Sequence, residues 1–315
     1  MEELNEQNQI ENEANDIPSA VPDRPKRDSG IDYFVLKTLA FASLTSYVFA
    51  FSGIITIKPL VIILGIIGYA SLPLFAFCSV ESYKHSQKLN SLIIRNIIFA
   101  LLCAFPYRFA FYSKKNLSDV RSYFSLELTC LLCIGAVMFY DRMKNKTQKM
   151  FCVAFMCAIS LFIGTEFAPY MPIITFVLFI YIKEQEGKDE AGFANGDKDR
   201  IAAVNRRKYL LSQYTFTKVA FFIVTLSIII PIVSVLFSRF VPGYSETYQD
   251  ELLRNYCMPG MLLSLPAIRF YNGEKGIENR LTKVVFRGYY LLLLVLVVMI
   301  KIFFLYDYSI LPVSG

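Results

Sequence analysis

The amino-acid sequence predicts an all-α protein, a polytopic bundle of about nine transmembrane helices. Apolar residues make up 55% of the 315-residue chain, a share that soluble domains of this size seldom gather into long runs. After Gly30 these residues form stretches of about 15 to 25, and a helix needs about 20 apolar residues to cross a bilayer core about 30 Å thick. Lipid cannot hydrogen-bond to the backbone, so each crossing segment must be helical.

The apolar stretches define nine candidate spans in chain order. They are residues 31–57, 60–80, 92–111, 123–140, 150–163, 167–182, 219–240, 252–270 and 288–306. The fifth and sixth are short enough to form one tight hairpin. The first stretch is not a signal peptide, because about 30 polar residues precede it and no small-residue cleavage site follows.

Basic residues alternate from one side of the predicted bundle to the other, which favours a cytoplasmic N-terminus. With this orientation the cytoplasmic connections carry Lys84, Lys88, Arg142, Lys144, Lys146, Lys149, Arg206, Arg207, Lys208, Arg269, Lys275, Arg280, Lys283 and Arg287. The opposite side receives Lys58, Glu166, Glu246, Asp250 and Glu251. One loop disagrees, since Lys114, Lys115 and Arg121 would lie outside.

The chain is predicted to contain one membrane domain with a polar tail at each end and a polar internal loop. Residues 1–30 have few apolar anchors and are expected to be a disordered cytosolic tail. The domain spans residues 31–306, and residues 307–315 form a short C-terminal tail. A cytosolic loop is expected at 183–218, either as a flexible tether or with a short surface helix over 201–214.

The formal net charge of +6 follows mainly from this loop asymmetry. It favours attraction to an anionic membrane surface or to an anionic cytosolic ligand. No basic and aromatic pattern of a nucleic-acid module is present, so the expected partner is the lipid bilayer of a bacterial inner membrane.

Histidine and cysteine usage limits the possible chemistry. The only histidine, His85, falls in a predicted cytoplasmic loop, where a solvated surface group is the ordinary interpretation. The seven cysteines are scattered through the spans, which is typical of packing and not of a disulfide framework. Cys130 and Cys133 form a CxxC without further ligands nearby, so no metal site is predicted.

Charged residues that fall within spans or close to their ends include Lys37, Arg95, Arg108, Glu127 and Lys301. A charge in hydrocarbon is costly and usually faces a partner or a wet cavity. Lys37, Arg95 and Lys301 have side chains long enough to reach an interface. Glu127 is shorter and lies more than a turn into its helix, which leaves structural pairing and function equally open.

Several motifs occur in order along the chain. Residues 64–81 read LGIIGYASLPLFAFCSVE, with Gly68, Pro73 and Glu81 as their most distinctive positions. Residues 99–111 read FALLCAFPYRFAF, and a small residue and an acid follow at 164–166. YNGEKG occupies 271–276, before the last span. Together these marks resemble the TraX family of conjugation-associated membrane proteins over about residues 33–305.

This resemblance implies a membrane-embedded acyltransferase. The family is associated with N-terminal acetylation of pilin subunits from cytosolic acetyl-CoA, so acetyl-CoA is the implied acyl donor and a pilin-like or secreted protein subunit an implied partner. Transfer of an acetyl group to an amine requires a base and hydrogen-bond donors for the developing oxyanion. Basic cytosolic loops suit the phosphates of coenzyme A and suit plain topology equally well.

The chain departs from the family pattern at positions where the family has groups that could transfer protons. The Asp-His pair expected late in the first span is replaced by residues 44–48, LTSYV, and the Arg after Gly68 is Tyr69. The residue after Glu81 is Ser82 where the family has Gly, and YYLL at 289–292 replaces a Tyr-Pro-x-His. Both family histidines are therefore missing, and it is open whether the chain is an enzyme.

Glu81 and Glu166 remain as the predicted catalytic carboxylates. The predicted substrate-binding residues are Lys84, Arg95, Arg108, Glu127, Asn272 and Lys275. Each mark also has a structural interpretation: Gly68 and Pro73 permit close helix approach and a kink, and Asn272 begins a turn. Glu81 would act as proton acceptor if burial raised its pKa, or would pair with a nearby cation.

Three functions stay open. The first is a TraX-like acyltransferase that works without histidine, and the second is a catalytically inactive TraX-like scaffold or assembly partner. The third is a transporter whose path is lined by Lys37, Glu127 and Arg108, although the sequence shows neither an inverted repeat nor paired broken helices.

Overall fold

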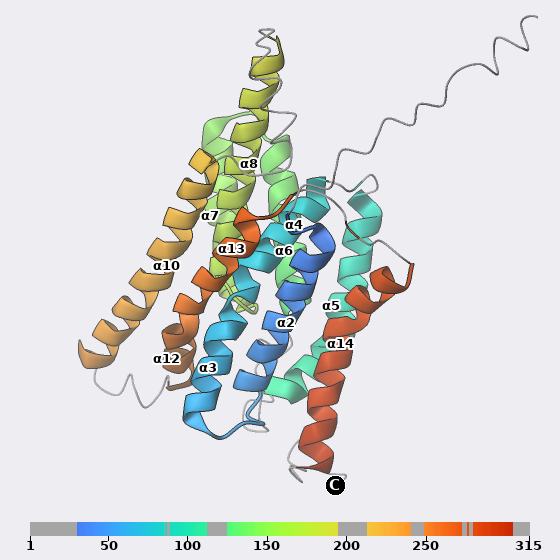
Figure 1. The fold of residues 1–315 in the computed structure, drawn as a ribbon, viewed down its shortest axis with the longest axis vertical. Helices are drawn as coiled ribbons and strands as arrows, with labels where there is room; N and C mark the ends of the chain where they lie inside the picture. The colour runs from blue at the N-terminus through green and yellow to red at the C-terminus, as the bar shows by residue number, and fades with distance from the viewer. Residues whose placement is uncertain are drawn as a thin grey trace, which may run out of the picture. The chain divides into compact units, whose positions relative to one another are not determined.

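Helix α4 (Ser71–Lys84) lies at the centre of the bundle and is buried without interruption from Ser71 to Glu81. It contacts α2, α6, α8 and α13, which surround it (Figure 1). A helix that buries all of its faces must satisfy its polar groups locally, and Ser79 Oγ does so by donating to the Phe75 carbonyl at 2.9 Å. Helix α4, which carries Pro73 and Glu81 of the motif at 64–81, is therefore a fully enclosed helix of the bundle.

The computed structural model describes residues 30–84, 86, 89–111, 125–194, 213–240, 249–272, 276 and 280–304. The other helices are α2 (Tyr33–Phe51), α3 (Lys58–Tyr69), α5 (Leu89–Phe111), α6 (Leu126–Arg142), α7 (Lys146–Ile163), α8 (Tyr170–Ala194), α10 (Gln213–Phe240), α12 (Gln249–Cys257), the 3-10 helix η3 (Met258–Leu263), α13 (Ser264–Arg269) and α14 (Arg280–Phe303). Every regular element among these residues is helical, and an isolated bridge joins Ile31 to Tyr271. The predicted all-α class is confirmed.

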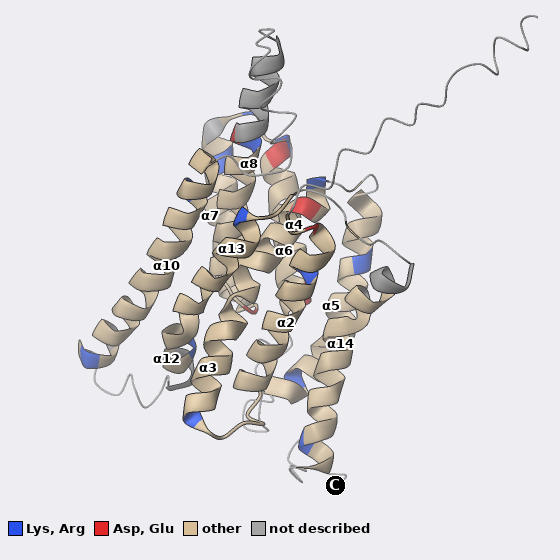
Figure 2. Cartoon of the chain, in the orientation of Figure 1, with Lys and Arg blue, Asp and Glu red and all other residues tan. Residues whose placement is uncertain are grey.

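Helix covers most of each stretch that the sequence marked as a candidate span. Four segments are long and apolar enough by themselves to cross a membrane: Tyr33–Phe51, Lys58–Lys84, Leu89–Phe111 and Gln213–Phe240. The helices at Thr147–Ile163 and Gly288–Phe303 are apolar but shorter. Charged residues lie mainly toward the helix ends, with long uncharged stretches between them (Figure 2).

Large apolar side chains cover the outside of the bundle. Among the most exposed are Leu101 on α5, Phe162 on α7, Phe221 on α10 and Leu292 on α14. Water-soluble monomers rarely expose contiguous apolar surface of this kind, whereas a bilayer solvates it. Together with the long apolar helices, this surface identifies a membrane protein.

The second predicted span is divided at Ala70 into α3 and α4. Pro73 stands in the first turn of α4, where its missing N–H removes no helical hydrogen bond, so the break precedes the proline. A Cβ on Gly68 would lie 2.6 Å from the Tyr47 Cα on α2. The expected close approach at Gly68 and the interruption near Pro73 are both present.

The eighth predicted span is also interrupted, and it lies against the first interrupted one. Pro259 and Pro266 accompany the change from α12 to η3 and then α13. A Cβ on Gly260 would lie 1.7 Å from the Ile66 carbonyl oxygen, so η3 and α3 meet backbone to backbone. The expectation that paired broken helices are lacking is therefore wrong, because Pro259 and Pro266 accompany a second interruption that packs against the first.

The predicted loop over 183–218 is helical where the structure describes it. Helix α8 continues to Ala194 and α10 begins at Gln213, so the described parts extend their neighbouring helices. The polar tail at 1–29, the C-terminal tail and His85 lie outside the described residues. Predictions about these segments remain predictions.

Candidate functional site

The turn between α7 and α8 carries Glu166 into the interior of the bundle. Helix α7 ends at Gly164, whose φ of +73° suits a left-handed C-cap and whose N–H donates to the Ser160 carbonyl at 3.0 Å. Phe167 also has a positive φ, +60°, which is unusual for a bulky residue. This conformation is held by burial, and Glu166 between the two is only 5% exposed.

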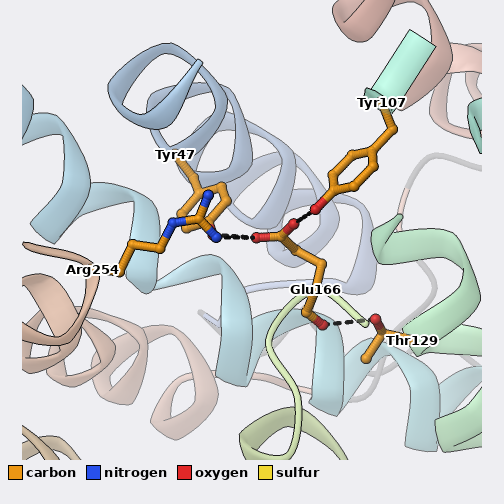
Figure 3. A network of polar contacts seen from close by, with 5 residues as sticks. All are labelled: Tyr47, Tyr107, Thr129, Glu166 and Arg254. Carbon is orange, nitrogen blue, oxygen red and sulfur yellow. Dashed lines mark hydrogen bonds and ion pairs between the residues drawn. The ribbon is translucent and has the colours of Figure 1, made fainter. Parts of the chain in front are cut away.

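Both carboxylate oxygens of Glu166 receive hydrogen bonds from buried phenols. Tyr47 on α2 donates to Oε1, and Tyr107 on α5 donates to Oε2. Thr129 on α6 donates its hydroxyl to the Glu166 backbone carbonyl at 2.7 Å. Figure 3 shows these side chains converging on Glu166 from separate helices. We call Glu166, Tyr47, Tyr107, Thr129 and Arg254 the Glu166 cluster.

Arg254 on α12 supplies the cation of the cluster. Its Nη1 lies 3.5 Å from Glu166 Oε1, longer than the usual charge-assisted hydrogen bond (Figure 3). The Arg254 side chain is 30% exposed, whereas that of Glu166 is 3% exposed. The guanidinium carbon also lies 5.4 Å from the centre of the Phe51 ring. Arg254 therefore connects the buried carboxylate with the surface of the bundle.

Aromatic rings enclose the carboxylate. The Tyr47 ring lies 4.7 Å from that of Phe167, 4.9 Å from Phe51 and 5.7 Å from Tyr69. On the other side the Tyr107 ring lies 4.9 Å from that of Phe111. Such a wall excludes water and strengthens the electrostatic interactions inside it.

The cluster combines an anion with proton donors. The phenol O–H groups and the guanidinium contact the Glu166 carboxylate, and a phenol that turns away from this carboxylate can donate to an oxyanion or a leaving thiolate. These are the group types that acyl transfer needs. They are equally the groups that would fix several helices to one another in a purely structural role.

Glu81 lies in a second polar region near the other end of α4. Tyr271 donates to Glu81 Oε2 at 3.2 Å, and both side chains are buried. Burial and the Glu81 charge raise the pKa of Tyr271 above its ordinary value, which keeps the phenol protonated as a donor. Asn272 is buried beside it, and its N–H donates to the Ile31 carbonyl at 3.0 Å. Glu81 therefore contacts Tyr271, the neighbour of Asn272 in the chain.

The two predicted catalytic carboxylates do not share one site. Tyr69, whose ring contacts Tyr47, precedes Glu81 by 12 positions, and the helical rise places them about 18 Å apart along α3 and α4. Glu81 and Glu166 therefore occupy separate regions of the bundle.

The remaining predicted residues are dispersed. Lys84 lines an open pocket at the end of α4. Arg95 on α5 interacts electrostatically with Glu127 on α6, and Arg108 is half-buried on α5 next to Tyr107. Lys275 lies outside the described residues. The assignment of these residues to substrate binding remains a prediction.

Two long cations near span ends have local structural contacts. Lys301 is buried and donates to the Ala110 carbonyl at 2.6 Å, which caps the C-terminal end of α5. The Lys37 ammonium lies 4.2 Å from the centre of the Tyr33 ring. Within the described part of the chain, no three His, Cys, Asp or Glu side chains come together as metal ligands.

Sequence reasoning missed Tyr47, Tyr107 and Arg254. A signal existed for Tyr47, because it falls in the segment that departs from the TraX pattern. Tyr69 and Tyr289 are departures of the same kind: the Tyr69 ring adjoins Tyr47, and the Tyr289 hydroxyl lies 2.7 Å from Thr45 Oγ1. These tyrosines at positions where this chain departs from the family pattern therefore lie on α2 or in contact with it.

Comparison with known proteins gives a family and no individual relative. A family model described as TraX protein matches residues 33–194, from the start of α2 to the end of α8. This part contains Glu81, Glu127 and Glu166, whereas Arg254 and the segment at 271–276 follow it. Searches of curated proteins and of solved structures found no match. Because the matched region is just over half of the chain, the protein belongs to the TraX family.

Proposed function

We propose that this protein is an integral membrane acyltransferase that moves the acetyl group of acetyl-CoA to an amine. The N-terminus of a pilin-like or secreted protein subunit is the acceptor class that the family association favours. The proposed setting is the bacterial inner membrane, with nine spans and a cytoplasmic N-terminus. TraX family membership and the apolar surface of the bundle support this setting.

The Glu166 cluster is the observation that carries the proposal. In the reaction a base removes a proton from the ammonium group, and the amine nitrogen then attacks the thioester carbonyl carbon. The nitrogen of the tetrahedral intermediate loses a second proton as the C–S bond breaks. One of the two protons goes to the coenzyme A thiolate, and the other passes to solvent. Glu166 would be the base. As it takes up the proton, Tyr47 and Tyr107 would turn their hydroxyl groups from the carboxyl to the oxyanion and the thiolate.

Glu81 and Tyr271 offer the same pair of groups, a carboxylate and a phenol, in the second region. Glu166 fits the chemistry better because each of its oxygens adjoins a phenol and a cation balances its charge. Glu81 is therefore the alternative base, and substitution of the two carboxylates distinguishes them.

The test is transfer of radiolabelled acetyl from acetyl-CoA to peptides with free N-termini by the detergent-purified full chain. Glu166→Gln should reduce transfer at least 100-fold, as expected for loss of a general base. Glu81→Gln serves as the comparison, and Glu184→Gln is the matched control because Glu184 forms an exposed pair with Lys218. Undiminished transfer by both Glu166→Gln and Glu81→Gln would refute these carboxylates as the base.

A non-catalytic scaffold is the second candidate. The observation that favours it is the saturation of Glu166, whose carboxylate and backbone carbonyl tie the α7–α8 turn to α2, α5, α6 and α12. In that case Glu166→Gln would weaken the bundle, and wild type would neither bind acetyl-CoA nor transfer acetyl. Recovery of the partner from cross-linked membranes would then identify what the scaffold binds.

Transport is favoured only by the contact between the two interrupted helical segments, α3–α4 and α12–η3–α13. Discontinuous helices often flank substrate sites in transporters. Flux of a labelled solute into proteoliposomes, without acetyl transfer, would favour this function over the other two.

A further inference from the structure

A pocket of about 410 Å³ opens where α4, α6 and α8 end their buried course and α5 begins. Its lining residues are Tyr83, Lys84, Ser86, Leu89, Asp141, Phe179, Ile182 and Lys183. The pocket is separate from the Glu166 cluster and shares no residue with it. Its size is in the range of small-molecule sites.

The polar side of this pocket is positively charged overall. Two lysines face one carboxylate, because Lys84 and Lys183 line the pocket together with Asp141. The Lys183 ammonium forms an ion pair with Asp141, and the Tyr83 hydroxyl donates to the same carboxylate at 3.0 Å. The lining therefore offers an anionic ligand two lysines and one serine.

Asp141 remains ionised beside these lysines. Partial burial acts to raise the pKa of its carboxyl, but hydrogen bonds from Lys183 and Tyr83 together hold the pKa below its ordinary value of 3.8. The Asp141 carboxylate therefore competes with any bound anion for Lys183 at neutral pH. Removal of this competitor should tighten anion binding, whereas removal of either lysine should weaken it.

The other side of the pocket is aromatic and aliphatic. The rings of Tyr83 and Phe179 lie 5.9 Å apart, edge to face, and Leu89 and Ile182 complete this side. A ligand with a flat ring and phosphate groups matches both sides at once, since rings stack on aromatic and aliphatic surface and phosphates bind ammonium groups.

We propose that this pocket binds a phosphate ester through Lys84 and Lys183. In its specific form, which rests on the proposed acyltransferase function, the ligand is the nucleotide end of acetyl-CoA. The 14 residues of α4 extend about 20 Å from Lys84 toward the Glu166 cluster. Coenzyme A carries its phosphates and its thioester at opposite ends of a flexible arm. If its phosphates bind in this pocket, the thioester can extend along α4 toward the Glu166 cluster.

Titration of the purified full chain with adenosine 3′,5′-bisphosphate by calorimetry tests the pocket directly. Saturable binding is expected, weakened about tenfold by Lys84→Gln or Lys183→Gln and tightened severalfold by Asp141→Asn. Lys58→Gln, at the exposed start of α3, is the control and should bind as wild type does. Absence of saturable binding, or equal binding by wild type and both lysine variants, would overturn the proposal.

A lipid headgroup could supply the same phosphate chemistry. Repeating the titration in nanodiscs of phosphatidylglycerol and of phosphatidylcholine separates the two sources. Equal affinity in both supports a soluble nucleotide as the ligand. Competition by phosphatidylglycerol that Lys84→Gln relieves would support phosphate binding and overturn the coenzyme A assignment.

The acetyl-transfer assay separates failure of the phosphate site from failure of the proposed enzyme activity. Lys84→Gln should raise the KM for acetyl-CoA about tenfold and leave kcat unchanged. Active enzyme with an unchanged KM would overturn the pocket assignment alone. Bisphosphate binding with the predicted pattern of variants, in a chain that transfers no acetyl, would overturn the proposed enzyme and support the phosphate site.

Discussion

Glu166 and Asp141 are surrounded by the same kinds of groups in different environments. Glu166 accepts from Tyr47 and Tyr107 and pairs with Arg254, while Asp141 accepts from Tyr83 and pairs with Lys183. The Glu166 side chain is 3% exposed and that of Asp141 is 30% exposed. Similar contacts should therefore have unequal energies, because water screens one set and is excluded from the other.

The largest effect is expected when the buried acceptor is removed. Glu166→Ala should destabilise the bundle by about 3–5 kcal/mol, because two buried phenols lose their acceptor and Arg254 loses its anion. Equilibrium unfolding in mixed detergent micelles measures this loss. Glu166→Gln keeps an acceptor oxygen, so its loss of unfolding free energy should be smaller than that of Glu166→Ala. Equal losses for the two variants would show that hydrogen bonding to this side chain is not the cause.

A second test addresses how tightly the enclosed region is packed. Gly68→Ala should cost about 1–3 kcal/mol, because the new Cβ would meet the Tyr47 backbone at 2.6 Å. Gly135→Ala is the matched control, since a Cβ there meets nothing within 4 Å. If thermal unfolding gave the same midpoint for both variants, the proposed fit of α3 against Tyr47 would be wrong.

Arg254 should contribute less than Glu166, because its contact is longer and partly exposed. Arg254→Gln is expected to cost about 1–2 kcal/mol, from a weakened charge-assisted contact with a buried carboxylate. Arg254→Lys should restore some of the loss, since it keeps the positive charge without the planar guanidinium. Unfolding of the three proteins in parallel provides the measurement, and a gain of stability in Arg254→Gln would contradict this order.

The smallest effect belongs to Asp141. Asp141→Asn should cost less than about 1 kcal/mol at neutral pH, because water screens the contact with Lys183. The pKa of the folded carboxyl lies below the unfolded value of about 3.9, so its stabilisation is complete above that value and is lost as the pH falls through the folded pKa. Unfolding midpoints of wild type and Asp141→Asn should therefore converge as the pH falls from neutral through the folded pKa of Asp141.

Periodic apolar stretches and prolines were enough to predict most of the fold. The stretches at 31–57 and 92–111 correspond to α2 and α5, because the thickness of a bilayer sets the length of a crossing helix. Gly68 and Pro73 correctly marked the close approach of α3 to α2 and the nearby interruption. The division of the stretch at 252–270 into α12, η3 and α13 was not predicted, and neither was its contact with the other interrupted helix.

The partners in the candidate site could not be predicted in this way. Tyr47, Tyr107 and Arg254 are separated from Glu166 by 119, 59 and 88 positions. A hydrophobic pattern shows which residues enter the membrane, but the orientation of each helix about its own axis depends on its neighbours. Tyrosines in apolar helices are common, and although Tyr47 departs from the TraX pattern, that departure names no partner. No pattern along the chain indicates that Tyr47, Tyr107 and Arg254 meet at Glu166.

The sequence by itself determined a helical membrane protein of the TraX family, its apolar stretches and its acidic candidates Glu81 and Glu166. Those properties depend on local composition, helix length and the order of motifs, which are all present in the linear sequence. The tertiary structure decided that the two carboxylates are separate, that two phenols and a guanidinium meet at Glu166, and that Lys84 and Lys183 share a pocket. Such convergence depends on long-range packing, in which distant segments bury one another's polar groups.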